Sequence, residues 1–301
     1  MHRLCEMARK DNRICLVVGD LGFSVVEPFI KEFPERFLNA GVAEQSMTGI
    51  AAGWSLAEGK VVFTYSLANF PTMRCLEQVR NDCCAHKANV KIISLGSGIT
   101  YGQSGYSHFA IEDLAIMNAM PNMTIFVPAD PVEARRCFDL AVKTTGPAYI
   151  RLARNGESVL NNKCPDFNVG DFIEYKAGVE LCLIGVGTIL SECLGAAKLL
   201  ETQVSSAVIG LPCFKPLNEN KLVEYLKNFS LIVTAEEHSP FGGLGSVIAE
   251  IIALHNLKVK FLKLTLPEGF DKIGPQQELL KFCGLNGEQI AKRVREILSN
   301  A

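Results

Sequence analysis

The carboxylate of Glu44 lies on the apolar face of an expected helix. The run from Val42 to Ala57 is largely apolar, and Met47, Ile50, Ala51 and Trp54 recur at the spacing of one helical stripe, which Glu44 shares. A carboxylate that shares a face with core residues must be paired, protonated or functional. An ordinary alternative remains open, because an acid in the first turn of a helix also complements the helix dipole.

A glycine-rich loop carries the next set of polar side chains. Residues 98–110 contain Ser104 and His108, and Glu112 and Asp113 follow before an apolar helix. A neutral imidazole is suited to proton exchange or to hydrogen bonding with a carbohydrate oxygen. The same residues also fit ordinary capping chemistry at the end of a helix, so this pattern leaves both interpretations open.

Short apolar runs alternate with helical stretches along the chain. In the first half, strands are expected at residues 14–19, 36–39, 60–64, 90–95, 123–127 and 148–152, with helices at 42–57, 71–87, 111–119 and 131–144. In the second half, strands are expected at 181–184, 206–209, 231–234 and 259–264, with helices at 190–201, 218–228, 245–254 and 287–298. This alternation predicts an α/β protein with two parallel-sheet, three-layer domains.

The polar stretch at residues 157–176 interrupts the alternation and contains Asn161, Asn162, Pro165 and Gly170. Such a composition is typical of a connection between domains. We therefore expect a first domain over residues 1–156, a linker over 157–176 and a smaller domain over 177–301.

Ligands of open parallel sheets bind beyond the carboxyl ends of the strands. Asp20 follows the first expected strand, and Ser24 lies four residues further on. Tyr65 and Phe70 follow the third strand, and Arg154 follows the sixth. Each has an ordinary structural alternative as a turn residue, a core aromatic or a solvated arginine.

Composition limits the class of protein. The chain has 301 residues, of which 48% are hydrophobic and 21% charged, and its net charge of −2 gives no electrostatic reason to expect nucleic acid or an anionic membrane as a partner. No apolar run approaches the roughly 20 residues of a membrane span. The eleven cysteines are scattered through apolar segments, and the first ten residues do not resemble a signal peptide, so we expect reduced thiols in a cytoplasmic protein.

Two longer motifs resemble the pyrimidine-binding domain of transketolases. Residues 36–45 read Arg-Phe-x-Asn-x-Gly-Val-Ala-Glu-Gln, and Gly-Ile-Ala-Ala-Gly follows at 49–53. Residues 98–115 read Gly-Ile-Thr-x-Gly-x-x-Gly-x-Ser-His-x-x-x-Glu-Asp-Leu-Ala. The second expected domain resembles the transketolase C-terminal domain. The resemblance therefore implies an enzyme that uses thiamine diphosphate.

The resemblance also implies roles for individual residues. Glu44 matches the family glutamate that hydrogen-bonds the aminopyrimidine ring and takes part in catalysis, and Phe70 matches the aromatic that stacks on this ring, with Tyr65 as a second choice. Asp20 matches a carboxylate that approaches the cofactor at the subunit interface. His108 matches a histidine that faces the substrate, so Glu44 and His108 are the expected catalytic residues.

The substrate end of the site departs from the family pattern. Ser24 and Arg154 match positions that contact a sugar phosphate, and arginine offers a bidentate fork for such an oxyanion. Ser104 stands where the family usually has an aspartate that contacts a substrate hydroxyl, and Gly96 replaces a histidine. We therefore expect Ser24, Ser104, His108 and Arg154 to bind a sugar other than the usual pentose phosphates.

The sequence lacks the Gly-Asp-Gly…Asn signature with which transketolases bind Mg²⁺ and the cofactor's diphosphate. We therefore expect the C-terminal subunit of a split transketolase, which transfers a two-carbon ketol unit from a ketose to an aldose. The resemblance implies that thiamine diphosphate lies between chains, with Mg²⁺ and diphosphate held mainly by a separate N-terminal subunit. It also implies a heterotetramer with two copies of each subunit.

Other functions remain open from the sequence. Beta subunits of 2-oxo acid dehydrogenases share this layout, and deoxyxylulose-phosphate synthases share the histidine-bearing loop. A non-catalytic scaffold subunit could retain the fold after losing the chemistry. A nucleotide-binding protein is a further alternative, suggested by the incomplete glycine pattern of Gly185 and Gly187.

Overall fold

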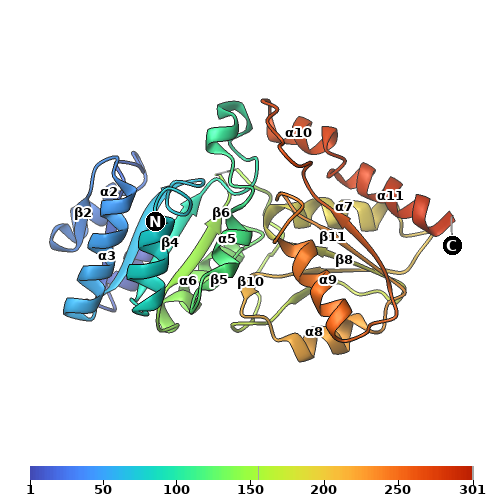
Figure 1. Ribbon diagram of the computed structural model, residues 1–301, viewed down its shortest axis with the longest axis horizontal. Helices are drawn as coiled ribbons and strands as arrows, with labels where there is room; N and C mark the ends of the chain where they lie inside the picture. Colours follow the sequence, from blue (N-terminus) through green and yellow to red (C-terminus); the bar gives the residue numbers. More distant parts are fainter. Residues whose placement is uncertain (155, 300–301) are drawn as a thin grey trace.

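The computed structural model describes residues 1–154 and 156–299, which form two α/β domains that lie side by side (Figure 1). Residues 155, 300 and 301 belong to the domain ranges expected from the sequence and lie outside the described residues. Each domain contains one twisted sheet with helices packed on it, which confirms the expected fold class.

The first sheet has seven strands in the order β10-β5-β6-β4-β3-β1-β2. Its strands are β1 Ile14–Val18, β2 Phe37–Asn39, β3 Val61–Leu67, β4 Val90–Leu95, β5 Thr124–Phe126, β6 Ala148–Leu152 and β10 Cys213–Lys215. The helices of this region are α1 His2–Ala8, α2 Glu27–Glu32, α3 Glu44–Glu58, α4 Leu76–Gln78, α5 Asp113–Ala119 and α6 Pro131–Lys143. Every side chain of β1 is buried, as expected for a parallel strand covered on both faces.

The second sheet has five strands in the order β12-β11-β8-β9-β7. Its strands are β7 Ile173–Lys176, β8 Leu181–Gly185, β9 Ser206–Gly210, β11 Leu231–Ala235 and β12 Lys260–Leu264. Its helices are α7 Leu190–Leu199, α8 Glu219–Leu226, α9 Leu244–Leu254, α10 Gln276–Phe282 and α11 Gly287–Ser299.

Two edge strands differ from the sequence-based expectation of purely parallel sheets. Strand β7 forms the end of the expected linker and pairs antiparallel with β9. Strand β10 belongs to the second half of the chain but pairs antiparallel with β5 of the first sheet. Both strands are short, and their pairing partners are distant in sequence, so local patterns gave no signal for them.

The helix expected at residues 71–87 is shorter than predicted. Cys75 has non-helical backbone angles (φ −119°, ψ 31°), α4 begins after it, and residues Val79–Ala85 continue as a π-helix. Residues 69–74 form turns instead, with Thr72 and Met73 donating backbone hydrogen bonds to the carbonyl of Asn69. This turn brings the residues after β3 back over the carboxyl end of the sheet.

The glycine-rich loop bridges the two domains. It projects beside α10 at the top of Figure 1, where the Gly274 N–H donates to the Gly102 carbonyl at 3.1 Å. A Cβ at Gly102 would lie 2.3 Å from the Gly274 carbonyl oxygen, so this close approach requires glycine. The loop that carries His108 is therefore held by both domains.

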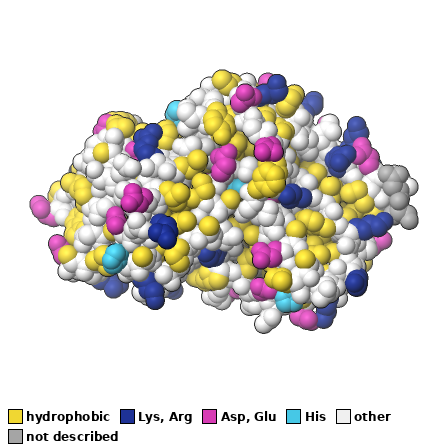
Figure 2. Space-filling view, viewed as in Figure 1, with side chains coloured by type: hydrophobic (Ala, Val, Ile, Leu, Met, Phe, Trp, Pro, Cys, Tyr) yellow, Lys and Arg dark blue, Asp and Glu magenta, His cyan; other side chains and the backbone are white. Residues whose placement is uncertain are grey.

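Across the described ranges, no helix has the length and apolar character needed to cross a membrane. On the face drawn in Figure 2, basic and acidic side chains lie interspersed among apolar ones. All eleven cysteines are free thiols, and most are buried, with Cys164 exposed.

Candidate functional site

Glu44 is the first residue of α3 and is almost fully buried. Its side chain is 1% exposed, and Gly41, with φ +75°, provides the turn between β2 and α3. Glu44 Oε1 accepts a hydrogen bond from Ser66 Oγ at 3.2 Å, and Oε2 accepts one from Arg74 Nη1 at 2.7 Å. The carboxylate expected from the sequence is therefore buried and paired, and its cationic partner is a residue that the sequence did not single out.

Arg74 connects Glu44 to two other expected residues. Its guanidinium carbon lies 4.2 Å from the centroid of the Phe70 ring, within the range of a cation–π contact. The Phe70 ring meets the His108 ring edge-on, with 5.4 Å between centroids. Glu44, Phe70 and His108 come from three separate segments, and the fold brings them into one contiguous group. We call this group, together with Ser66 and Arg74, the Glu44 cluster.

His108 ends a short 3₁₀ turn, Tyr106–His108, and is partly buried. Its Nδ1 atom lies 3.0 Å from the hydroxyl oxygen of Ser107. Among the described residues, this contact and the Phe70 edge contact account for the polar and aromatic neighbours of the ring. The Nε2 atom therefore remains available to a ligand.

Asp20 and Ser24 lie on the exposed loop after β1, and both have positive φ angles, 55° and 63°. Asp20 and Asn39 form a reciprocal pair, in which the Asp20 N–H donates to Asn39 Oδ1 and Asn39 Nδ2 donates to Asp20 Oδ1, each at 3.0 Å. The Ser24 N–H donates to Glu27 Oε1 at 2.7 Å. Local contacts thus hold this loop at the carboxyl end of the sheet, beside Glu44.

Tyr65 and Phe70, the two candidate stacking aromatics, occupy different environments. Tyr65 lies in β3 with 7% of its side chain exposed, and a Cβ at Gly22 would lie 3.1 Å from its ring. Burial raises the pKa of Tyr65 to about 12. Phe70 is partly exposed and contacts Arg74 and His108. The structure therefore joins Phe70, but not Tyr65, to the Glu44 cluster.

Ser104 and Arg154 lie apart from that group, on a cavity of about 500 Å³ between the two domains. Polar side chains dominate its lining, among them Thr100, Gln103, Ser104, Arg154, Thr188 and Gln276. The Arg154 side chain is exposed, and its guanidinium carbon lies 5.6 Å from the Tyr101 ring centroid. Ser104 and Arg154 thus form a second, adjoining region, whereas Ser24 lies on the loop after β1 and His108 lies beside Phe70.

Tyr101 explains why Gly96 stands where the family has a histidine. Gly96 has φ +101°, and a Cβ built on it would lie 2.2 Å from Tyr101 Cε2. The phenol ring therefore fills the space that any side chain at position 96 would need. Tyr101 was not among the residues expected at the site, although the replacement of a large residue by glycine signalled that a neighbour had taken the space.

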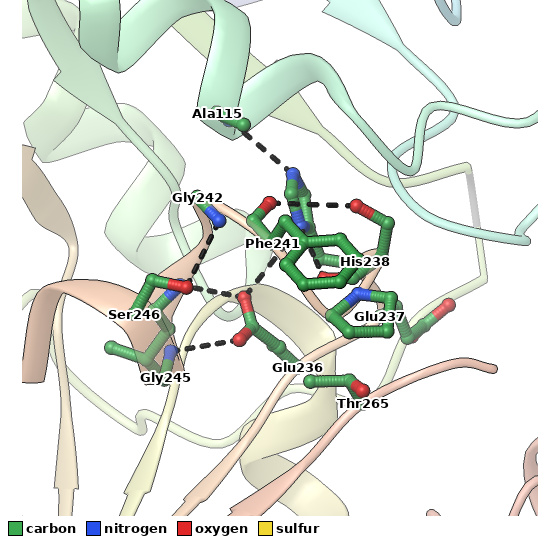
Figure 3. A network of polar contacts seen from close by, with 12 residues as sticks. Ala115, Glu236, Glu237, His238, Phe241, Gly242, Gly245, Ser246 and Thr265 are labelled. Atoms are coloured by element: carbon green, nitrogen blue, oxygen red, sulfur yellow. Dashed lines mark hydrogen bonds and ion pairs between the residues drawn. The ribbon is translucent and has the colours of Figure 1, made fainter. Parts of the chain in front are cut away.

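A buried polar network joins the domains below the loop (Figure 3). Glu236 Oε2 and Oε1 accept from the N–H groups of Leu244 and Gly245, at 2.6 and 2.8 Å, at the start of α9. Burial raises the pKa of Glu236 to about 7. Glu237 Oε2 accepts from the Ile99 N–H at 3.2 Å and from Gln276 Nε2 at 2.9 Å. These two carboxylates therefore fasten α9, the glycine-rich loop and α10.

His238 belongs to the same network. Its Nδ1 lies 2.9 Å from the Ser239 carbonyl oxygen, and its Nε2 accepts from the Ala115 N–H at 3.3 Å (Figure 3). A carbonyl only accepts and a backbone N–H only donates, so these contacts require the neutral ring with its proton on Nδ1. Burial lowers the pKa of His238, in agreement with that state.

Asp113, which belongs to the glycine-rich motif, has a structural position. Its carboxylate accepts from Arg151 Nε at 2.7 Å and from the Tyr149 hydroxyl at 2.6 Å. Arg151 also donates to the carbonyls of Ala110 and Glu237. This buried ion pair fixes the end of the loop to β6 and to the second domain, and it lay outside the sequence-based site.

The Glu44 cluster suits an aminopyrimidine ring. A buried carboxylate, which holds a ring nitrogen or amino group by hydrogen bonding, lies next to an aromatic face, which stacks on a flat ring. The described part of the chain shows no comparable site for a metal ion. No three His, Cys, Asp or Glu side chains of residues 1–154 and 156–299 form a group that could hold one.

The family models match both parts of the chain. Residues 1–156 match the transketolase pyrimidine-binding domain, and residues 172–290 match the transketolase C-terminal domain. The chain therefore belongs to the transketolase family.

Similar proteins narrow this assignment. The chain is 38% identical to the putative transketolase C-terminal section of Methanocaldococcus jannaschii, over 97% of this chain and 93% of that protein. It is 34% identical to one subunit of the apulose-4-phosphate transketolase of Actinobacillus succinogenes, over 91% and 89%. A solved structure described as "Split gene transketolase, inactive beta4 tetramer" superposes with a TM-score of 0.87 at 35% identity, over 99% of this chain and 96% of that one.

The chain thus corresponds to the C-terminal subunit of a two-subunit transketolase, which confirms the expectation from its motifs.

Proposed function

We propose that this subunit, together with a separate N-terminal subunit, transfers a two-carbon ketol unit from a ketose phosphate to an aldose. Thiamine diphosphate is the cofactor that the family implies, and Mg²⁺ accompanies it. We propose a heterotetramer with two copies of each subunit in the cytoplasm, in which the N-terminal subunit holds the metal and the diphosphate.

The observation that carries the proposal is the convergence of Glu44, Phe70 and His108. These residues lie in three segments separated by more than twenty residues, yet they form one group at the carboxyl end of the first sheet. That edge is where ligands of parallel sheets bind. A scaffold protein that had lost the chemistry would have no need to keep a carboxylate buried beside an aromatic face.

Each residue of the group has a defined task. Glu44 hydrogen-bonds the pyrimidine ring and exchanges a proton with it, Phe70 stacks on the ring face, and Asp20 approaches the cofactor from the loop after β1. His108 offers its Nε2 atom to the hydroxyl groups of the donor sugar, since Nδ1 contacts Ser107. When bound, thiamine diphosphate supplies the carbanion chemistry that cleaves a carbon–carbon bond next to a carbonyl.

The cavity between the domains supports a role in substrate binding. Arg154 is a cation there, and Ser104 and Tyr101 add neutral hydroxyl groups to the lining. We propose that Arg154 and Ser24 bind the phosphate and that Ser104 contacts a sugar hydroxyl. Tyr101 fills the space beside Gly96, where the family has a histidine. The bound sugar would therefore meet the Tyr101 phenol at this place instead of a histidine that could carry a positive charge. The expected result is a donor other than the common pentose phosphates.

A titration of thiamine diphosphate with Mg²⁺, followed by calorimetry, tests the shared site. It is run on this chain alone, on the N-terminal subunit alone and on their mixture, and we expect tight binding only in the mixture. Tight binding to this chain alone would contradict the shared site. Absence of binding in a mixture whose subunits associate would favour a scaffold.

A donor screen then separates the related activities. The assembled enzyme should form a two-carbon transfer product from a ketose phosphate and an aldose. Turnover of pyruvate in place of ketoses would instead indicate an enzyme similar to the 2-oxo acid dehydrogenases or the deoxyxylulose-phosphate synthases.

A further inference from the structure

Arg74 contacts both the Glu44 carboxylate and the Phe70 ring, which are the groups proposed to bind the pyrimidine ring of the cofactor. Its Nη1 atom donates to Glu44 Oε2 at 2.7 Å, and its guanidinium lies over the Phe70 ring at 4.2 Å. The guanidinium is planar and carries only donors, so it makes a stacking contact and a hydrogen bond at the same time. An aminopyrimidine ring, which is also planar and carries an amino donor, would make the same two contacts.

We propose that Arg74 is a built-in placeholder for the pyrimidine ring, holding Glu44 and Phe70 until the cofactor displaces it. The inference rests on the proposed function, because it takes Glu44 and Phe70 as the ring-binding residues. It adds that Arg74 competes with the pyrimidine ring for the contacts to Glu44 and Phe70.

Burial decides which partner of the ion pair moves. The Glu44 side chain is 1% exposed, and its backbone is fixed in the first turn of α3. The Arg74 side chain is 44% exposed and precedes α4 in a segment of turns. An arginine that already contacts water loses little on moving into it, whereas a buried carboxylate cannot follow.

The contact with Arg74 also stabilises the free subunit. A buried carboxylate without a partner is costly, and Ser66 supplies only one neutral hydrogen bond, at 3.2 Å. Arg74 therefore stabilises the buried Glu44 carboxylate while no cofactor is present. The same contact must lower the apparent affinity for thiamine diphosphate, because only the fraction of molecules with Arg74 released is competent to bind it.

Removal of Arg74 tests the competition directly. In the complex with the N-terminal subunit, Arg74→Ala should lower the Kd for thiamine diphosphate with Mg²⁺ about tenfold, the factor expected if about nine-tenths of the molecules hold Arg74 in place. The melting temperature of the free subunit should fall. Arg80→Ala is the matched control, since Arg80 is exposed on the neighbouring π-helix and its guanidinium donates to the side chain of its neighbour Asn81, and it should change neither quantity.

A conservative variant guards against misfolding. Arg74→Lys keeps the charge but lacks the planar group that stacks on Phe70, so its Kd should lie between those of the wild type and Arg74→Ala. An unchanged or raised Kd in both variants would overturn the placeholder and make Arg74 an ordinary positioning residue of Glu44.

A crystal structure of the wild-type complex with thiamine diphosphate and Mg²⁺ provides a readout independent of activity. Arg74 Nη1 should no longer lie within hydrogen-bond distance of Glu44 Oε2, and a retained bond would overturn the inference. The proposed function would fail on a different result, namely unchanged turnover in Glu44→Gln. A failure of the proposed function can therefore be distinguished from a failure of the Arg74 proposal.

Discussion

The Glu44 cluster and the interdomain network both bury carboxylates, but backbone N–H groups donate to the carboxylates of the network, whereas side chains donate to Glu44. Glu236 accepts two backbone N–H groups at the start of α9, and Glu237 accepts a backbone N–H and the Gln276 amide. Within residues 1–154 and 156–299, Glu44 accepts only from side-chain donors, of which Arg74 is nearly half exposed. Backbone partners cannot leave without unfolding a helix or loop, whereas Arg74 can. Burial alone therefore does not distinguish Glu44 from Glu236 and Glu237, whereas an exposed side-chain partner does.

The largest effect is expected for Glu44→Gln. The variant keeps the shape of the side chain but removes its ability to take a proton, so turnover of the assembled enzyme should fall about 10²–10⁴-fold while the fold persists. Steady-state rates measure the turnover, and the circular dichroism spectrum shows whether the fold persists. Glu58→Gln, at the exposed end of the same helix, is the control and should retain activity. Near-normal turnover in Glu44→Gln would show that the Glu44 carboxylate has no catalytic role.

Glu236→Gln should act on stability. Its amide NH₂ replaces one of the oxygens that accept from Leu244 and Gly245, which leaves a buried N–H without an acceptor. We expect the free energy of unfolding to fall by about 2 kcal/mol, measured by denaturant titration. Glu224→Gln, exposed on α8, should leave it unchanged. A loss of turnover in folded Glu236→Gln protein without a loss of stability would contradict the division between the two regions.

Arg154→Ala tests the adjoining cavity. Loss of a charged contact to phosphate should raise KM for a phosphorylated ketose about tenfold, with a smaller change in kcat. An unphosphorylated ketose should show little change, and Arg135→Ala, on α6 and paired with Glu6, serves as the control. An equal increase in KM for both sugars would mean that Arg154 does not bind the phosphate.

The smallest effect concerns the pH dependence of the interdomain contact. Because burial lowers the pKa of His238 in the folded protein, the unfolded chain binds more protons once the pH falls below about 6.5. The His238 contribution to the free energy of unfolding should therefore decrease as the pH falls from 6.5 towards the folded pKa, by at most about 1.4 kcal/mol per pH unit.

His238→Gln tests this contribution, since its amide oxygen still accepts from the Ala115 N–H but does not titrate. Glu236, whose raised pKa gives the opposite slope between 4.5 and about 7, is present in both proteins, and its Oε2 lies 4.0 Å from His238 Nδ1, so the difference reports His238 together with its coupling to Glu236. Melting curves at pH 5–8 should therefore show a smaller loss at low pH in the variant. His2→Gln, exposed at the start of α1, is the control. Identical slopes would mean that His238 is not held neutral.

Local sequence patterns predicted most of the first sheet. Strands β4 and β6 begin and end where the apolar runs at residues 90–95 and 148–152 do, and α3 covers most of its expected range. The stripe on α3 was less regular than expected, since Met47 and Ala51 are buried but Ile50 is 40% exposed. Periodicity locates a helix well but defines its buried face less sharply.

Several short elements gave no local signal. Helices α1, α2 and α10 have six or seven residues each, and β10 has three. Elements of this length are stable only through their packing partners, and β10 pairs with β5, some ninety residues away in the chain. Their positions therefore depend on the assembled fold.

The sequence by itself determined the order of strands and helices, the family motifs and the candidates Glu44, Phe70 and His108, because these depend on residues close together in the chain. Only the tertiary structure decided that Arg74 lies on Glu44, that Tyr101 fills the space beside Gly96, and that Arg154 and Ser104 belong to a separate cavity. Hydrogen bonds and steric exclusion act over a few ångströms in space, so residues distant in sequence acquire these relations only when the sheet brings their loops to one edge.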